Sequence, residues 1–204
     1  MADGILKVGT ITTSSGSGTI TLGQSGETLS VPSGATLDIA SGATLDTTGA
    51  TVTGISGNVI TSADTWRLTA DFSGGADPIS SNLEQNDDAS FEVIGTPMSV
   101  SSGIFTFPET GKYLIHAVFQ MYNTSSQTQG DIQYTTNNSS YSTGANCRSQ
   151  MASTSYNSVS TSMIFDVTST TNCKVKFKAS SGGTIMGNSG YNGTHFQFIR
   201  IGST

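Results

Sequence analysis

The chain has 204 residues, a net charge of −6 at pH 7 and only 11% charged residues, so it lacks the clustered Lys and Arg that binding to nucleic acid requires. It holds 24 Gly and 4 Pro and is rich in Ser and Thr, a composition that disfavours helix and suits strands and turns. The first residues show no basic segment followed by an apolar core, and no apolar run is long enough to cross a bilayer. We therefore expect an all-β protein without a signal peptide or membrane insertion.

The first third of the chain repeats with a period of eight residues. The dipeptide Ser-Gly recurs at positions 17, 25, 33 and 41 and opens the units SGTITLGQ, SGETLSVP, SGATLDIA and SGATLDTT. Apolar residues alternate within the units, which is strand periodicity interrupted by glycine turns. The regularly spaced apolar side chains are Leu29, Val31, Leu37, Ile39 and Leu45.

Each repeat carries too few apolar side chains to build a core within one chain. Two outcomes are open: a flexible Ser/Gly linker, or several copies that wind together and bury their leucines on a shared axis. The regular apolar positions favour the second outcome. We predict a repetitive β stalk over residues 17–63, preceded by a particle-docking segment, residues 1–16, and followed by a globular head, residues 64–204.

From residue 64 onward aromatic residues become frequent, and strand-like segments recur at short intervals. This pattern suits one antiparallel sandwich of two sheets. The predicted strands cover residues 66–72, 91–100, 103–107, 112–122, 131–136, 145–152, 158–167, 174–179 and 195–201.

The segment from Gly103 to Ile115 reads GIFTFPETGKYLI, that is Gly-x-Phe, then Pro, then Gly-x-Tyr-x-apolar. Phe105 and Phe107 alternate on one strand, a Pro/Gly turn follows, and Tyr113 returns on the next strand. Together with the closing FQFIRIG, this arrangement resembles the C1q/TNF-like jelly-roll family over residues 64–202.

The resemblance implies an antiparallel jelly-roll head in a homotrimer, with both ends of the head next to a fibrous stem. There is no collagen repeat here; the SGATLD-type units resemble instead the stalks of phage fibres. The expected protein is a structural virion fibre, made in the host bacterial cytoplasm. It would bind another virion protein through its N-terminus and a host surface glycan or protein through its head. The alternatives are a capsid or neck decoration fibre without host recognition and, less favoured, a glycan depolymerase.

The family topology would place four loops at the free end of the head, residues 73–90, 123–130, 153–157 and 180–194. These loops combine Asn, Ser and Gly with Tyr, a mixture that recognition loops use, although ordinary solvated turns have the same composition. The candidate ligand-contacting residues are Tyr191, Asn192, Asn188, Tyr156 and Asn123.

The sequence does not indicate catalytic or metal chemistry. The only histidines, His116 and His195, read as structural or surface residues, although a three-fold axis could triple either into a metal or anion site. The only cysteines, Cys147 and Cys173, are expected to be free thiols, with a disulfide bridge as the alternative. We expect no catalytic residue, no metal ion and no cofactor.

Overall fold

The computed structural model describes residues 11, 18–22, 26–46, 60–86, 90–124, 127–150, 153–180 and 183–204. Of the predicted docking segment, residues 1–16, only residue 11 belongs to these ranges. The chain divides into two compact units, residues 1–54 and residues 55–204. The described ranges contain strands, turns and extended segments but no helix. No helix that could cross a membrane is therefore found in these ranges.

The first unit repeats a tight turn every eight residues. Ala35 N donates to Pro32 O at 3.0 Å, and Ala43 N donates to Ala40 O at the same distance. The third residue of each turn, Gly34 or Gly42, has φ near +85°. This left-handed conformation is strained for residues with a Cβ atom and is required at that position of a type II turn. The repeat read from the sequence is therefore a repeat of turn and extended segment.

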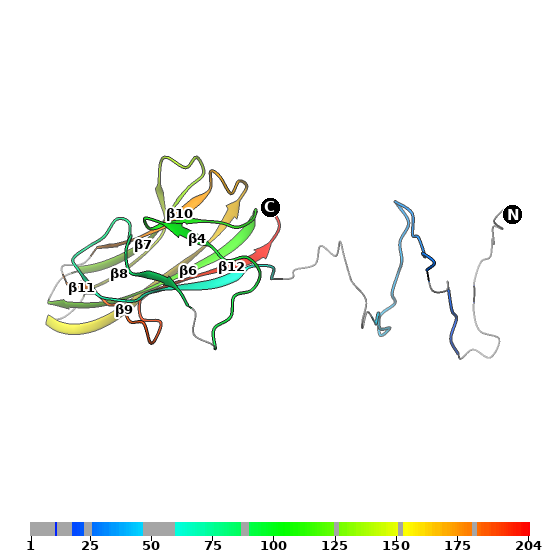
Figure 1. Ribbon diagram of the computed structural model, residues 1–204, viewed down its shortest axis with the longest axis horizontal. Coiled ribbons are helices and arrows are strands. Elements are labelled where there is room, and N and C mark those ends of the chain that lie inside the picture. The colour runs from blue at the N-terminus through cyan, green and yellow to red at the C-terminus, as the bar shows by residue number, and fades with distance from the viewer. Residues whose placement is uncertain are drawn as a thin grey trace. The chain divides into compact units, whose positions relative to one another are not determined.

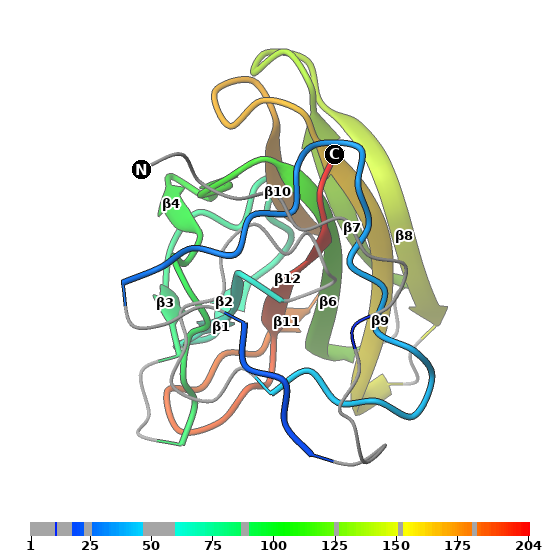
Figure 2. The same ribbon diagram turned by 90° about the vertical axis from the view of Figure 1, so that its right-hand side faces the viewer.

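The second unit is built from strands alone in its described residues (Figures 1 and 2). They are β1 (Ala63–Leu68), β2 (Phe72–Ser73), β3 (Leu83–Gln85), β4 (Ser99–Ser101), β5 (Ile104–Thr106), β6 (Gly111–Thr124), β7 (Gln127–Thr135), β8 (Ser142–Gln150), β9 (Ser153–Val167), β10 (Lys174–Ser180), β11 (Thr184–Ile185) and β12 (His195–Gly202).

All strand pairs are antiparallel, and they form two sheets. The larger sheet has the order β2-β11-β6-β12-β1-β3, with β9 paired to the other side of β6. The smaller sheet has the order β4-β5-β10-β7-β8. Figure 2 shows the two layers, with β6, β9 and β12 in one and β7, β8 and β10 in the other. The fold is an antiparallel jelly-roll sandwich, which confirms the predicted fold class of the head.

The strand registers fix which connections lie together. Gly202 at the end of β12 pairs with Lys112 near the start of β6, whereas Thr124 at the end of β6 pairs with Ser153. Because neighbouring strands run in opposite directions, four connections fall at the end away from Gly202, here called the far end: β1 to β3, β6 to β7, β8 to β9, and β10 to β12. This is the arrangement that the family resemblance implied.

Two of the predicted loops, residues 123–130 and 153–157, are wrong. β6 extends to Thr124 and β7 begins at Gln127, while β9 already begins at Ser153. Their Ser, Thr, Asn and Gln residues suggested loops, but β6 and β9 pair along almost their full length, and this pairing satisfies the backbone. Side-chain polarity therefore predicts a loop only where no partner strand is available.

A further prediction, a strand over residues 91–100, is also wrong for most of its length. Only Ser99–Ser101 forms a strand, and Ile94 makes an isolated bridge to Ala63. The first strand lies earlier than expected: it begins at Ala63 and ends at Leu68. Of the apolar residues that suggested the longer strand, Ile94 makes only this bridge to Ala63, Met98 is buried in the core and Phe91 is exposed.

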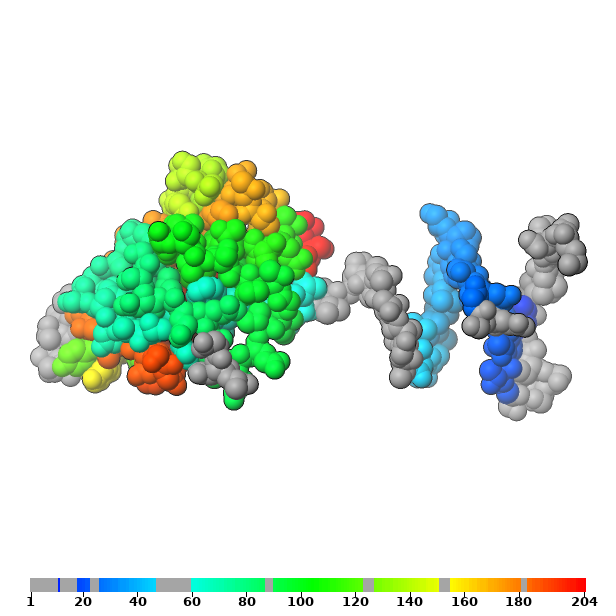
Figure 3. Space-filling model, viewed as in Figure 1, coloured from blue at the N-terminus to red at the C-terminus, as the bar shows by residue number. Residues whose placement is uncertain are grey.

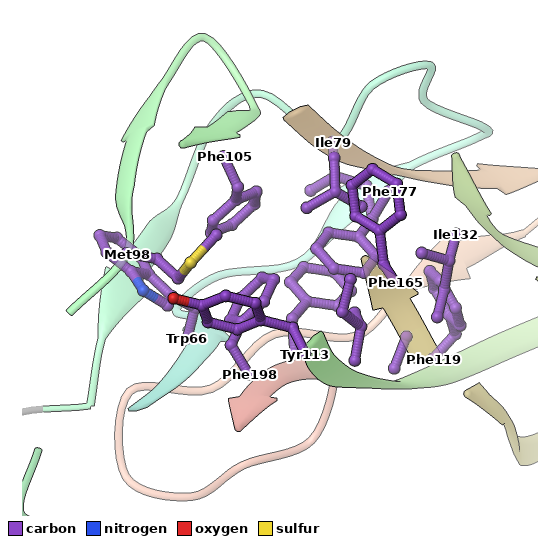
Figure 4. Packing of buried hydrophobic residues seen from close by; sticks show 14 of the residues in the cluster. Trp66, Ile79, Met98, Phe105, Tyr113, Phe119, Ile132, Phe165, Phe177 and Phe198 are labelled. Atoms are coloured by element: carbon purple, nitrogen blue, oxygen red, sulfur yellow. The ribbon is translucent and has the colours of Figure 1, made fainter. Parts of the chain in front are cut away.

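An aromatic cluster fills the space between the sheets (Figure 4). The rings of Phe177 and Phe196 are stacked with 3.7 Å between their centroids, and Trp66 packs edge-on against Phe105 at 5.5 Å. Phe105 and Phe107 are both buried, as their alternation in the sequence predicted. These rings join residues from strands β1, β5, β10 and β12, so burial of the cluster holds the two sheets together.

A steric constraint explains the second glycine of the predicted signature, Gly111. Gly111 has φ +148°, and a Cβ atom there would lie 2.6 Å from Gly202 O and would also overlap the side chain of Arg200. Arg200 Nε donates to Thr110 O at 2.9 Å, which holds its guanidinium over this position. The last strand therefore packs so closely on the start of β6 that only glycine fits.

Candidate functional site

The larger sheet has one face against the core and a second face, here called the outer face, turned away from the smaller sheet. Strand alternation assigns side chains to it, because their neighbours along each strand are buried in the core. The outer face consists of Ala63, Thr65 and Arg67 on β1; Lys112, Leu114, His116, Val118, Gln120 and Tyr122 on β6; Tyr156, Ser158, Ser160, Ser162, Ile164 and Asp166 on β9; and His195, Gln197 and Ile199 on β12.

An apolar row crosses the outer face at its end near Gly202. Ile164 pairs with Leu114, Leu114 with Ile199, and Ile199 with Ala63, which in turn bridges to Ile94. The two ends of this row are the most exposed: Ile164 is 65% and Ile94 48% accessible. The row, composed of Ile164, Leu114, Ile199, Ala63 and Ile94, forms an apolar strip across the sheet and not a set of isolated surface residues.

The two ends of the apolar row differ in shape. At one end a hollow of about 120 Å³ is lined by Ala63, Ile94, Gln197 and Ile199, among others. At the other end Ile164 projects from β9, which pairs only with β6 and so forms the edge of the sheet. The same face therefore carries an apolar knob on one edge and a hollow near the other.

A pair of tyrosines lies on the outer face toward the far end. Tyr122 on β6 and Tyr156 on β9 are register partners, and their ring centroids are 4.8 Å apart. Tyr156 is 68% exposed. Tyrosine supplies a large, rigid contact area with a polar tip, which is why it is enriched at protein interfaces.

Three rows lie between the apolar row and the tyrosine pair, and the two nearer the apolar row are here called the histidine strip; the third row is Gln120 with Ser158. Gln197 pairs with His116, and His195 pairs with Val118, so the two histidines are diagonal neighbours on β12 and β6. Burial, and next the charge of His195, lower the pKa of His116. The strip consists of Ser162, His116, Gln197 and Thr65 in one row and of Ser160, Val118, His195 and Arg67 in the next.

The predicted ligand-contacting residues fall in two places. Tyr156 lies on the outer face, and Asn123 is near the end of β6, its side chain outside the described set. Tyr191, Asn188 and Asn192 lie in the segment 186–194 between β11 and β12, which Figure 3 shows as an orange-red protrusion on the head. The structure therefore does not gather the five candidates into one site.

Within the segment 186–194, two of the three candidates support the backbone or the neighbouring strand. Asn188 Oδ1 accepts from Gly190 N at 2.7 Å, and Asn192 Oδ1 accepts from Asn86 Nδ2 at 3.0 Å. Tyr191, in contrast, is 54% exposed. Asn188 and Asn192 are thus engaged in hydrogen bonds with other parts of the protein, and the segment presents one tyrosine ring to solvent.

The apolar side chains of the first unit are exposed throughout its described residues. Leu29, Leu37 and Leu45, one per octad, are 66%, 62% and 61% accessible, and Val31 and Ile39 are 44% and 43% accessible. The same octad position therefore has the same exposure in successive repeats. One copy of the chain leaves this whole series of side chains in water.

The cysteines are free thiols, the first of the two alternatives. Cys173 is buried, and Cys147 on β8 is half-buried. Burial, with the nearby charge of Asp131 adding to it, raises the pKa of Cys147, so this thiol stays protonated at neutral pH. In the part of the chain that the structure describes, no three His, Cys, Asp or Glu side chains are placed to hold a metal ion.

No protein-family model and no curated protein matches this sequence. Solved structures match its fold. The crystal structure of murine APRIL at pH 5.0 has a TM-score of 0.55 and 14% identity, over 68% of this chain and 98% of that one. The structure of Eiger TNF from S. frugiperda has a TM-score of 0.57 and 10% identity, over 70% of this chain and 93% of that one. The likeness concerns the fold: the head is a TNF-like jelly roll, in agreement with the sequence resemblance.

Proposed function

We propose that this chain is a structural, non-enzymatic virion protein, a homotrimeric phage fibre or appendage whose head attaches the particle to the host surface. The observation that carries the proposal is the exposure of Leu29, Leu37 and Leu45 at intervals of eight residues, each more than 60% accessible in a single copy. Apolar side chains that recur in register and lie in water within one copy require a partner to cover them.

Three parallel copies of the stem would bring equivalent leucines together at each octad. Burying one such side chain from its exposed state contributes about 1.5–3 kcal/mol. The octad turns at Gly34 and Gly42 keep the same spacing in every copy, so identical chains match each other along their length. A stem of identical copies therefore repeats one favourable contact at each octad, whereas a flexible linker gains nothing from this regularity.

The head supports self-association by an independent argument. The outer face has an exposed apolar residue, Ile164, at one edge and a hollow near the other. Apolar and polar residues line this hollow: Ala63, Ile94 and Ile199 together with Asp64, Thr65, Glu92 and Gln197. When a knob and its hollow lie on different edges of one subunit, copies join head to tail, and such a contact forms a ring when the rotation from copy to copy closes. A ring of three heads matches a stem of three copies in number.

The attachment function follows from the arrangement of three identical heads on one stem. Three weak contacts on a single particle fibre act together as one strong attachment, through effective concentration. Tyr191, exposed on the segment 186–194, is the residue we assign to contact with a host glycan or surface protein. The N-terminal residues would dock on another virion protein after synthesis in the bacterial cytoplasm.

The oligomeric state of the full chain tests the proposal. Light scattering at size-exclusion chromatography should give about three times the 21.0 kDa chain mass. Replacing Leu37 and Leu45 with Asp should yield monomers or lower the temperature at which the assembly dissociates. The matched control replaces Thr36 and Thr44, one position earlier in the same octads, with Asp. A monomeric wild type, or a fully trimeric and equally heat-stable leucine variant, would contradict the stem.

Binding of the purified trimer to intact host cells separates attachment from a purely architectural role in a capsid or neck. Tyr191→Ala should weaken cell binding while the trimer persists. Tyr141→Ala is the control, because Tyr141 lies on the connection between β7 and β8, at the other end of the head. Cell binding that is absent in the wild type, or equal in both variants, would contradict the assigned attachment role of Tyr191.

A further inference from the structure

The only two histidines of the chain lie side by side on the outer face. His195 pairs with Val118 and Gln197 pairs with His116, so the two imidazoles occupy a diagonal of the β12–β6 pair. His195 Nδ1 is 3.0 Å from Gly193 O, a contact that places the proton on Nδ1 and turns Nε2 away from that carbonyl. The sequence separates the two histidines by almost eighty residues, and only the sheet brings them together.

The charged groups around the histidine pair are mostly cationic or already paired. On β1, Arg67 is the register partner of His195. Arg67 Nε donates to Glu84 Oε2 on β3 at 2.9 Å, and Arg67 is almost fully buried. Further carboxylates near this face lie toward the Gly202 end: Asp64 and Glu92 line the hollow, and Asp166 of β9 is the register partner of Lys112.

The remaining neighbours of the histidine pair carry no charge. Ser160 and Ser162 of β9 flank it on one side, since Ser162 pairs with His116 and Ser160 with Val118. Thr65 of β1 lies beside Gln197 on the other side. Protonation of both imidazoles would therefore place two new positive charges beside Arg67 on a surface where the nearest carboxylate, that of Glu84, is already engaged.

The histidine strip lies between the apolar row and the tyrosine pair, so a second copy that covers both must cover the strip as well. Covering it removes water from two imidazoles and strengthens their repulsion, since charges interact more strongly away from solvent. The lowered pKa of His116 in the uncovered head has the same two causes, burial and the charge of His195. The dissociated chains then bind more protons than the assembled ones, so acid favours dissociation.

We propose that His116 and His195 make the contact between heads pH-dependent, closed at neutral pH and loosened when this pair is protonated in acid. This inference rests on the proposed function, because it requires that heads associate through the outer face. It adds to that function a release step, in which an acidic compartment or medium would separate the heads without unfolding them.

Sedimentation velocity of the full chain over a dilution series at pH 8.0 and pH 5.0 tests the inference. The wild-type association between copies should be at least about tenfold weaker at pH 5.0, because each proton bound on dissociation changes the constant up to tenfold per pH unit. Replacing both His116 and His195 with Gln should abolish most of this difference. The glutamine side chains keep both positions polar and neutral, and the variant removes every imidazole of the chain.

A matched control replaces Lys178 of the smaller sheet, which pairs with Asp77, with Gln and should keep the wild-type pH response. Circular dichroism at both pH values shows whether the head stays folded. Equal wild-type association at pH 8.0 and 5.0, or an unchanged pH response in the histidine variant, overturns the inference and leaves the trimeric fibre intact. A wild type that is monomeric at pH 8.0 overturns the proposed function, and this inference with it.

Discussion

Replacing Ile164 with Ser tests the contact between heads at a single exposed side chain. Ile164 is 65% accessible in one copy, so folding of the head gains little from it and should change by no more than about 0.5 kcal/mol. Burying a whole isoleucine side chain contributes about 1.5–3 kcal/mol. The exposed two-thirds of Ile164 therefore offers about 1–2 kcal/mol to each contact between copies.

A ring of three copies contains this contact three times, so the variant should lose about 3–6 kcal/mol of association free energy. Since about 1.4 kcal/mol corresponds to a factor of ten, the association constant should fall by about 10²–10⁴. Sedimentation equilibrium over a wide dilution range measures this change directly. Tyr191→Ser is the control, since Tyr191 is also about half exposed, at 54%, but lies on the segment 186–194.

The outcome that would refute this reasoning is an Ile164→Ser variant with an intact fold and an unchanged association constant. Knob and hollow would then not meet, and self-association, if present, would arise from the stem alone. A loss of association together with loss of the folded head would instead show that Ile164 stabilises the sheet edge. That result would contradict the small folding contribution inferred from its exposure in one copy.

Two further predictions concern the stability of the head, each measured by urea unfolding. Phe196→Ala should destabilise the head by about 3–5 kcal/mol, because its fully buried ring stacks on Phe177 at 3.7 Å. The control is Phe91→Ala: Phe91 is 52% exposed, so this variant should change the stability of the head by only about 0.5 kcal/mol. A small effect at Phe196 would contradict the aromatic core. Burial raises the pKa of Asp64 above its ordinary value of 3.8, although Trp66 Nε1 donates to Oδ2 at 2.8 Å. The folded state then binds more protons than the unfolded one between the two pKa values, so stability falls as pH rises through that window. Asp64→Asn should remove this dependence and gain stability relative to wild type at pH 7 more than at pH 3; equal differences at both pH values would contradict it.

Much of the fold could be read from the sequence because its signals are local. The alternation of Phe105 and Phe107 fixes which side of one strand is buried, and the Pro/Gly turn that follows fixes the reversal into β6. The octad glycines likewise indicate the backbone conformation at their own positions, since φ near +85° at Gly34 and Gly42 disfavours any residue with a side chain. Such features depend on a few neighbouring residues, so they can be predicted without knowledge of the tertiary structure.

The polar strands were missed for a related reason. The segment that opens β9, STSYN (residues 153–157), has too little apolar character to predict a strand, yet it pairs with β6 from Ser153 onward. Its backbone finds hydrogen-bond partners in β6, and the side chains that face outward are free to be polar. The alternation of Ser158 and Ser160 in the predicted strand 158–167 continues back to Tyr156, but the short polar side chains of residues 153–157 made this segment indistinguishable from a loop.

The candidate site was only partly accessible to sequence reasoning. Tyr156 and Tyr191 were singled out for their aromatic character, and both are exposed. Ile164, Leu114 and Ile199 were not recognised as a surface, since each lies in a strand where an apolar residue is ordinarily assigned to the core. Their shared outward orientation depends on the register of three strands, so it cannot be predicted from any single segment of the sequence.

The sequence by itself determined the classes of local structure: an eight-residue repeat of turn and extended chain, and a series of strands with an aromatic buried side. These follow from backbone preferences and from the period-two alternation of a strand. Only the tertiary structure decided which strands are neighbours, and hence that Ile164 and Ile199 lie in one row and that His116 meets His195. The physical reason is that a sheet is held by pairing between distant segments, and the pairing register emerges when both sheets close over one core.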